Sequence, residues 1–263
     1  MMRLDRFLSG QTALSRREVS EAVRRGRVTV GGMPVRSPDL KINPETDPVT
    51  LDGRAVCYAE NHYFLLHKPA GVLTAARDRS QRTVMDLLRP EDRLPGLFPC
   101  GRLDKDTSGL LLITDDGALS HRILSPKHHI TKYYLAQLRD PYDPAYETLF
   151  QSGIVLREGS GEEACLPAAC TAVGPHLAVI ALCEGKYHQV RRMFAAAGNF
   201  VEKLLRFQLG AMELPANLAQ GSYLTILPKD VELMLKTSSI SLAAAFCSKN
   251  YSSYWINERA HLW

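Results

Sequence analysis

The segment 101–117 constrains this chain more than any other. A polar loop that contains Arg102, Asp104 and Asp106 leads directly into the apolar run 110–113, and an Asp-Asp-Gly turn follows. A short apolar run bounded by turn residues is typical of a buried strand. The loop is therefore expected at the mouth of a core strand, where a rigid element can hold a reactive carboxylate. An equally good interpretation from spacing alone is a capped turn, with Asp104 or Asp106 bonded to local backbone amides.

The composition is that of an ordinary globular protein and excludes several other classes. The chain has 263 residues, 45% hydrophobic and 23% charged, enough for one large domain or two. Six scattered cysteines without a C-x-x-C argue against a zinc site or a disulfide scaffold and favour a reducing cytosol. The start lacks a signal-peptide core, and no apolar run reaches the length of a membrane span. We therefore expect a soluble cytoplasmic protein without a membrane partner.

Arginines concentrate near the N-terminus. Residues 1–36 hold eight Arg and three acidic residues, a local charge of +5. Two short helices are predicted within residues 2–20, and Ser15 with Glu18 forms the pattern of a capping box. A charge run on a helix is usually a solvated face, but arginine is also suited to gripping phosphate oxygens. The candidate phosphate contacts along and just beyond the second helix are Arg16, Arg17, Arg24 and Arg25.

Residues 62–236 show the alternating patterns of a second domain. Strands are predicted at 63–66, 132–138 and 179–182, and helices at 83–88, 118–124 and 188–199. In the strand 132–138, Lys132 and Tyr134 share one face, whereas Tyr133 is on the other and is expected in the core. Residues 237–263 show no pattern that can be assigned, and we treat them as a tail of unknown role.

Several motifs resemble those of the pseudouridine synthases. Gly-Arg-Leu-Asp at 101–104, followed by Thr-Ser-Gly-Leu-Leu-Leu, resembles the catalytic motif of this family. The N-terminal Arg-Leu-Asp-Arg-Phe-Leu and Val-Arg-Arg-Gly-Arg-Val-Thr-Val-Gly-Gly resemble the S4 RNA-binding fold. Further family motifs are Lys-Pro-x-Gly at 68–71, Lys-x-Tyr at 132–134, His-Gln-x-Arg at 188–191 and Leu-x-Arg-x-x-x-Gly at 204–210.

The resemblance implies an α+β fold. A small N-terminal S4 (α-L) RNA-binding domain at 1–58 precedes a pseudouridine synthase domain at 62–236, which has a mixed or antiparallel sheet and a central catalytic cleft. The implied reaction breaks the N1–C1′ bond of uridine, rotates the uracil and rejoins it through C5. This chemistry needs no metal and no organic cofactor, which agrees with the lack of a glycine-rich dinucleotide loop and of zinc spacing.

By the same resemblance, the catalytic residues are Asp104, Tyr134 and Arg191. Asp104 is the carboxylate near the sugar; whether it stabilises an oxocarbenium-like centre, attacks covalently or removes a sugar proton stays open. Arg191 is the cation expected to keep Asp104 charged, and Tyr134 the aromatic that holds the detached uracil. Arg102 is expected to fill the space that the flipped base leaves. The other expected substrate or RNA contacts are Lys132, Arg206 and Lys68, the last at the cleft rim without a catalytic role.

The run Ser-Pro-Lys-His-His at 125–129 resembles the branch that acts on small-subunit rRNA. It implies isomerisation in 16S rRNA, at uridine 516, by a monomer that binds small-subunit rRNA or a ribosome assembly intermediate. A large-subunit rRNA synthase and a non-catalytic rRNA-binding assembly factor are the alternatives. The adjacent histidines His128 and His129 have no third ligand at a usual metal spacing, and the deaminase pattern H-x-E with P-C-x-x-C is missing.

Overall fold

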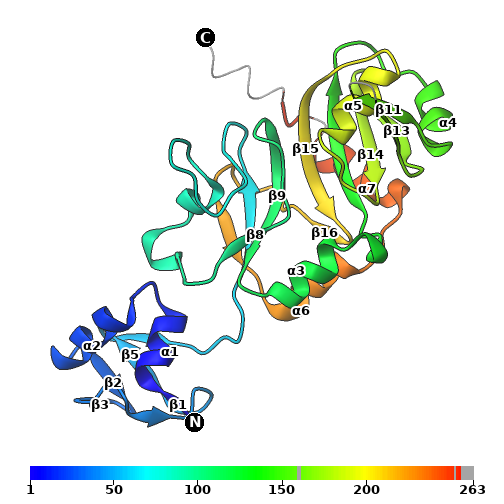
Figure 1. Cartoon of the computed structure of the whole chain (residues 1–263). Helices are drawn as coiled ribbons and strands as arrows, with labels where there is room; N and C mark the ends of the chain where they lie inside the picture. The colour runs from blue at the N-terminus through cyan, green and yellow to red at the C-terminus, as the bar shows by residue number, and fades with distance from the viewer. Residues whose placement is uncertain (159–160, 252, 256–263) are drawn as a thin grey trace.

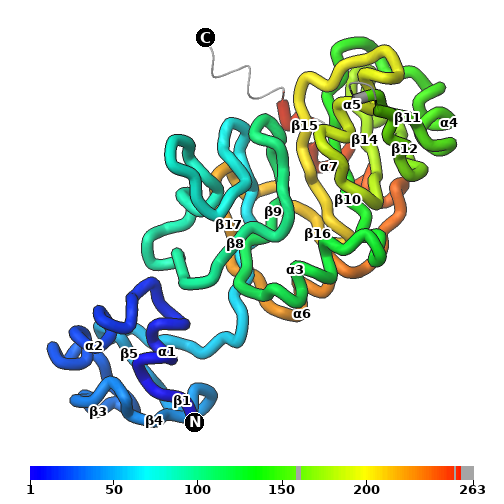
Figure 2. Tube along the Cα trace, in the orientation of Figure 1, coloured from blue at the N-terminus to red at the C-terminus, as the bar shows by residue number. Residues whose placement is uncertain are grey.

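The computed structural model describes residues 1–158, 161–251 and 253–255, in two modules (Figures 1 and 2). The N-terminal module, in blue, is joined to the larger module by one segment of chain, and at the junction Gln11 Oε1 lies 3.2 Å from His62 Nε2. The last strand of the first module ends at Val56, and the first strand of the second begins at Tyr63. A small N-terminal module of two helices and short antiparallel strands, followed by a larger module built on a mixed sheet, agrees with the fold class expected from the sequence.

In the N-terminal module, helices α1 (Leu4–Gln11) and α2 (Arg16–Arg24) pack on a small antiparallel sheet of order β3-β2-β5-β6. The predicted capping box is confirmed, because Ser15 Oγ accepts from Glu18 N and the Glu18 carboxylate accepts from Ser15 N. One face of α2 is buried and the arginines are exposed on the other. The strands are β1 (Met2–Arg3), β2 (Val28–Val30), β3 (Met33–Pro34), β4 (Lys41–Ile42), β5 (Val49–Leu51) and β6 (Arg54–Val56).

The larger module is built on one mixed sheet with the strand order β13-β14-β10-β15-β9-β7-β17, to which β16 and β8 add at β15 and β9. The predicted strands are confirmed as β7, β10 and β14. The strands are β7 (Tyr63–Lys68), β8 (Phe98–Cys100), β9 (Thr107–Thr114), β10 (Lys132–Leu138), β13 (Ala169–Gly174), β14 (Leu177–Leu182), β15 (Val201–Leu209), β16 (Met212–Glu213) and β17 (Tyr223–Thr225), with β11 (Val155–Glu158) and β12 (Gly161–Ala164) as a separate pair.

A short parallel seam joins the two halves of this sheet. Strands β9 and β15 pair in parallel over three residues each, whereas the other pairs in the sheet are antiparallel. At the seam Gly109 has φ +120°, and a Cβ there would lie 2.2 Å from the Arg206 carbonyl oxygen. Only glycine therefore permits this approach of the two backbones. Strand β9 begins directly after the loop that contains Asp104, so the seam fixes the position of that loop in the sheet.

Helices cover both faces of the sheet. One apolar core contains Tyr134 and Ala136 of β10 with α4 (Ala145–Gln151), α5 (Gln189–Ala196) and the 3₁₀ helix η1 (Val84–Leu87). The opposite core contains Tyr133, buried as predicted, with α3 (Gly117–Leu124), α6 (Pro228–Val231) and η4 (Glu232–Leu235). The predicted helix 118–124 is confirmed as α3 with Asp116 as its N-cap, and the remaining 3₁₀ turns are η2 (Pro90–Asp92) and η3 (Pro126–His128).

Much of the segment treated as a patternless tail is a helix. Helix α7 (Ile240–Tyr251) packs on β10, β13 and β14 and buries Ala243, Cys247 and Tyr251 in the second core. These three residues recur every four positions, but an alanine and a cysteine make the stripe too weakly apolar to stand out in the sequence. The rest of that tail, from residue 256 on, lies outside the described residues.

Candidate active site

A cleft of about 600 Å³ lies between the loop 101–106 and the side of the sheet that carries β10, β14 and the start of α5. Arg102, Asp104 and Tyr134 line it, so the structure brings together three of the residues selected from the sequence. Tyr187 and His188, which sequence reasoning did not select, line the same cleft. Arg102 is exposed, and the Asp104 side chain is 30% exposed.

The backbone around Asp104 is held from behind by the segment that follows β7. Thr74 Oγ1 donates to the Leu103 carbonyl at 2.7 Å, and the Gly71 amide donates to the Lys105 carbonyl at 2.7 Å. The Thr107 amide closes a turn onto the Asp104 carbonyl at 3.1 Å. Since the loop backbone is bonded on both sides of residue 104, the carboxylate is presented to the cleft from a fixed position.

Lys68 is not at the cleft rim, and that expectation is corrected. Its side chain is fully buried, and Nζ donates to the carbonyls of Pro69, Lys105 and Thr107 at 3.0, 3.1 and 2.8 Å. Burial lowers the pKa of the Lys68 ammonium to about 8, although the nearby carboxylates of Asp106 and Asp104 favour the charged form. An ammonium has three donors, and here three carbonyls use them to brace the loop.

Arg191 lies across the loop, but its ion pair is with Asp106 and not with Asp104. The Arg191 Nη2 to Asp106 Oδ2 distance is 2.9 Å, and Arg191 Nη1 donates to the Val201 carbonyl at 2.8 Å. The expected direct pairing with Asp104 is therefore replaced by a bridge that ties the loop to α5. Through Asp106, this ion pair braces the loop against α5. A cation-forming group that does lie within ion-pair distance of Asp104 is His188, with Nε2 3.6 Å from Oδ1.

Arg206 is an internal brace, which corrects its expected role as an RNA contact. The side chain is 4% exposed, and Nε and Nη2 donate to the Leu110 carbonyl at 3.0 and 2.8 Å. The guanidinium thus bonds the backbone of β9 immediately beyond the seam at Gly109. A residue enclosed between two strands cannot reach a polyanion. Sequence spacing could not reveal this, because the two partners lie 96 residues apart.

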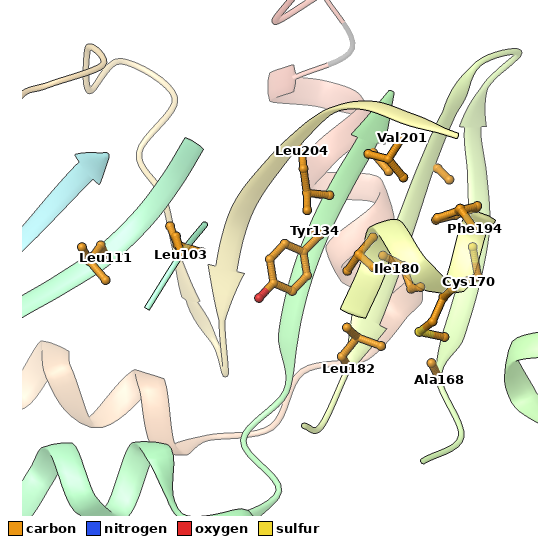
Figure 3. Packing of buried hydrophobic residues seen from close by; sticks show 14 of the residues in the cluster. Leu103, Leu111, Tyr134, Ala168, Cys170, Ile180, Leu182, Phe194, Val201 and Leu204 are labelled. Atoms are coloured by element: carbon orange, nitrogen blue, oxygen red, sulfur yellow. The ribbon is translucent and has the colours of Figure 1, made fainter. Parts of the chain in front are cut away.

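The two residues predicted to share a face of β10 differ in surroundings. Tyr134 is 9% exposed and lines the cleft, and Figure 3 shows its ring between Leu103 and Ile180 with the hydroxyl pointing away from Ile180. Lys132 is half-buried, and its Nζ donates to the Ile130 carbonyl at 3.1 Å. Burial, and then the charge of Arg206, lower the pKa of Lys132. A planar ring at the cleft wall is suited to hold a base.

Comparisons with known proteins agree with this geometry. Residues 62–196 match the family model for RNA pseudouridylate synthase, and residues 2–47 match the S4 domain. The chain belongs to the RNA pseudouridylate synthase family. It is 40% identical over 233 residues to ribosomal small subunit pseudouridine synthase A of Escherichia coli, covering 88% of this chain and 98% of that protein.

Two further relatives place the similarity over nearly the whole chain. An uncharacterized RNA pseudouridine synthase of Bacillus subtilis, YtzG, is 38% identical over 234 residues, covering 89% of this chain and 98% of that protein. A crystal structure of a pseudouridylate synthase superposes with a TM-score of 0.61 at 35% identity, covering 89% of this chain and all of that one. This protein is accordingly a pseudouridine synthase with an S4 domain.

A metal site and a membrane span each have structural requirements that the described part of the chain does not meet. Across residues 1–158, 161–251 and 253–255, no group of three or more His, Cys, Asp or Glu side chains converges to hold a metal ion. Within the same residues, no helix has both the length and the apolar character needed to cross a bilayer.

The buried ammonium of Lys68 predicts a loss of activity at alkaline pH. Above about pH 8 the ammonium loses a proton and one of its three donors, so the loop around Asp104 loosens. The effect on stability has the opposite sign. Between about pH 8 and 10.5 the folded protein releases the Lys68 proton, whereas the unfolded chain still binds it. The contribution of Lys68 to the free energy of unfolding therefore rises with pH in this range.

The measurement is the single-turnover rate from pH 7 to 10, with a falling limb expected near pH 8. In Lys68→Arg the guanidinium stays charged throughout, so the variant is expected to be slower but to lack that limb. A limb of unchanged position in Lys68→Arg would show that a different group controls it.

Proposed function

We propose that this pseudouridine synthase isomerises one uridine of small-subunit (16S) rRNA, uridine 516, with the S4 domain supplying RNA contacts. The observation that carries the proposal is the 37–40% identity, over nearly their whole length, to relatives named ribosomal small subunit pseudouridine synthase A from Haemophilus influenzae, Vibrio cholerae and Escherichia coli. The run 125–129, which resembles the small-subunit branch, lies between α3 and β10, and its residues 126–129 are exposed.

In the proposed reaction, the Asp104 carboxylate acts next to the sugar while the N1–C1′ bond breaks. Tyr134 holds the detached uracil as it rotates, and its hydroxyl assists removal of the C5 proton. Arg102, exposed at the cleft mouth, takes the space of the base that leaves the stack. Arg191 contributes by holding Asp106, and through it the loop that carries Asp104.

The test uses rRNA that carries tritium at uridine C5, because rejoining uracil through C5 releases this atom. Small-subunit and large-subunit rRNA are incubated separately with the full chain, tritium release is counted, and the modified position is mapped. Release from small-subunit rRNA at one position is the expected result. Release from large-subunit rRNA alone would move this synthase to the other branch, and tight binding without release from either would favour an assembly factor.

The S4 arginines predict a specific salt dependence of binding. Arg24, the last residue of α2, and Arg25, its C-cap, are both exposed. Replacing both with glutamine should reduce the slope of log Kd against log salt by about 1 to 2, since each arginine that contacts a phosphate releases counterions. A matched control is Arg139→Gln with Arg157→Gln, which removes the same charge from the catalytic module. An unchanged slope in the Arg24/Arg25 variant would remove these two residues from the interface.

A further inference from the structure

The turn between β14 and α5 is tightly anchored on its outer side. The Glu184 carboxylate accepts from the Leu166 amide at 2.9 Å and from Gln189 Nε2 at 2.6 Å. Lys186 Nζ donates to the Ala164 carbonyl at 2.8 Å and lies 3.2 Å from Glu163. These contacts with β12, with Leu166 and with the first residue of α5 hold the turn in a fixed position at the edge of the cleft.

Tyr187 and His188, at the end of the turn, line the cleft as a stacked pair. The rings of Tyr187 and His188 lie 3.9 Å apart, centroid to centroid, with an angle of 17° between their planes. His188 covers one face of the Tyr187 ring, yet Tyr187 is still 68% exposed, so its other face is open to solvent. An exposed large aromatic on a rigid turn beside a reactive carboxylate is not explained by core packing.

The backbone at His188 is in an unusual conformation. With φ 49° and ψ 32°, His188 occupies the left-handed region, which is uncommon for a residue other than glycine. Such conformations persist where surrounding contacts over-determine them, and they gather at functional sites. Here the conformation, immediately before the first turn of α5, directs the imidazole so that Nε2 lies 3.6 Å from Asp104 Oδ1.

We propose that Tyr187 and His188 act together as the positioning element of the cleft: His188 holds the orientation of the Asp104 carboxylate, and Tyr187 stacks on an RNA base next to the target uridine. The inference rests on the established pseudouridine synthase activity and on rRNA as the substrate, but not on which subunit's rRNA is modified. Aromatic stacking is suited to this place, because a base beside the flipped uridine has lost a neighbour. The exposed cations Arg102 and Lys105, which also line the cleft, are suited to the adjoining phosphates.

The two residues predict different kinetic effects. Removing the ring in Tyr187→Leu should weaken RNA binding about tenfold with little change in the single-turnover rate at saturation, whereas Tyr187→Phe keeps the stacking face and should bind as the wild type does. Replacing His188 with phenylalanine keeps a ring against Tyr187 but removes the nitrogen near Asp104. The single-turnover rate should fall about 100-fold with Kd changed less than about twofold, because a displaced reacting group lowers the rate and not the affinity.

The experiment uses an RNA fragment that the wild-type protein modifies, from either subunit, so failure of the small-subunit proposal is detected in the wild-type reaction itself. Fragments with an abasic residue 5′ or 3′ of the target uridine are then bound to the wild type and to Tyr187→Leu. One abasic position should weaken binding to the wild type about tenfold and leave binding to Tyr187→Leu unchanged, since the stacking partner is already missing.

Three results would overturn the inference: equal losses with both proteins at both abasic positions, wild-type affinity in Tyr187→Leu, or the full single-turnover rate in His188→Phe. The thermal midpoint of each variant is measured to separate positioning from folding. If the His188→Phe variant does not fold because phenylalanine is strained in the left-handed conformation, His188→Asn replaces it in the same rate comparison, since asparagine tolerates that conformation.

Discussion

Replacing Asp104 with asparagine is expected to lower the single-turnover rate by about 10⁴-fold or more, as is usual when the central group of a catalytic unit is removed. The amide has the size of the carboxylate, and the loop backbone stays bonded to Lys68 and Thr74, so the cleft keeps its shape. Without a negative charge the side chain can neither stabilise an oxocarbenium-like centre, nor attack it, nor remove a sugar proton. RNA affinity should therefore change less than about twofold.

Tritium release and filter binding measure the two quantities on the same protein preparation. Asp106→Asn is the matched control: this carboxylate is two residues away, 64% exposed and paired with Arg191, so its loss should slow the reaction only about tenfold through the loop. Asp143→Asn, an exposed carboxylate before α4, should match the wild type. Turnover by Asp104→Asn comparable to that of Asp106→Asn would refute the assignment of the catalytic carboxylate.

Removing the Tyr251 ring is expected to destabilise the synthase strongly. Tyr251 is 2% exposed in the core behind β10 and β14, and its hydroxyl donates to the Leu214 carbonyl at 2.6 Å. Truncating a buried aromatic to alanine costs about 3–5 kcal/mol, and in a protein of this size each kcal/mol lowers Tm by about 2–4 °C. Tyr251→Ala should therefore lower the thermal midpoint by roughly 6–20 °C.

Differential scanning calorimetry on matched variants separates the contributions. Tyr251→Phe keeps the ring and leaves the Leu214 carbonyl without this donor, which should cost about 1–2 kcal/mol. Leu242→Ala, on the same helix but 68% exposed, should change stability by less than about 0.5 kcal/mol. A midpoint of Tyr251→Ala equal to that of Leu242→Ala would mean that α7 does not stabilise the fold.

The parts of this protein that could be predicted from sequence are those encoded within a few neighbouring residues. Alternation along 132–138 predicted β10 and the burial of Tyr133, and the capping pair Ser15 with Glu18 predicted the start of α2. The motif at 101–104 predicted the loop at the mouth of β9. Each of these depends on a period of 2 or 3.6 residues or on a turn signal, which the chain carries wherever it folds.

Contacts between segments that lie far apart in the sequence could not be predicted from such local patterns. Lys68 bonds carbonyls 37 and 39 residues away, and Arg206 bonds a carbonyl 96 residues away. Whether a basic side chain meets solvent, RNA or a buried carbonyl depends on strand order and register, because a shift of one residue turns a side chain to the opposite face. The motifs therefore assigned Lys68 and Arg206 to the cleft. The structure shows that both side chains are buried inside the protein and are not exposed in the cleft.

The sequence by itself determined the two-module organisation, the family, the strand that presents Asp104 and the aromatic strand opposite it. The tertiary structure decided which groups surround that carboxylate: a buried ammonium behind the loop, an arginine that pairs with Asp106, and a histidine in the left-handed conformation beside Asp104. The physical reason is the range of the information. Local patterns specify elements, whereas the parallel seam at Gly109 and the packing of α5 against the loop bring these groups into register only when the whole sheet has formed.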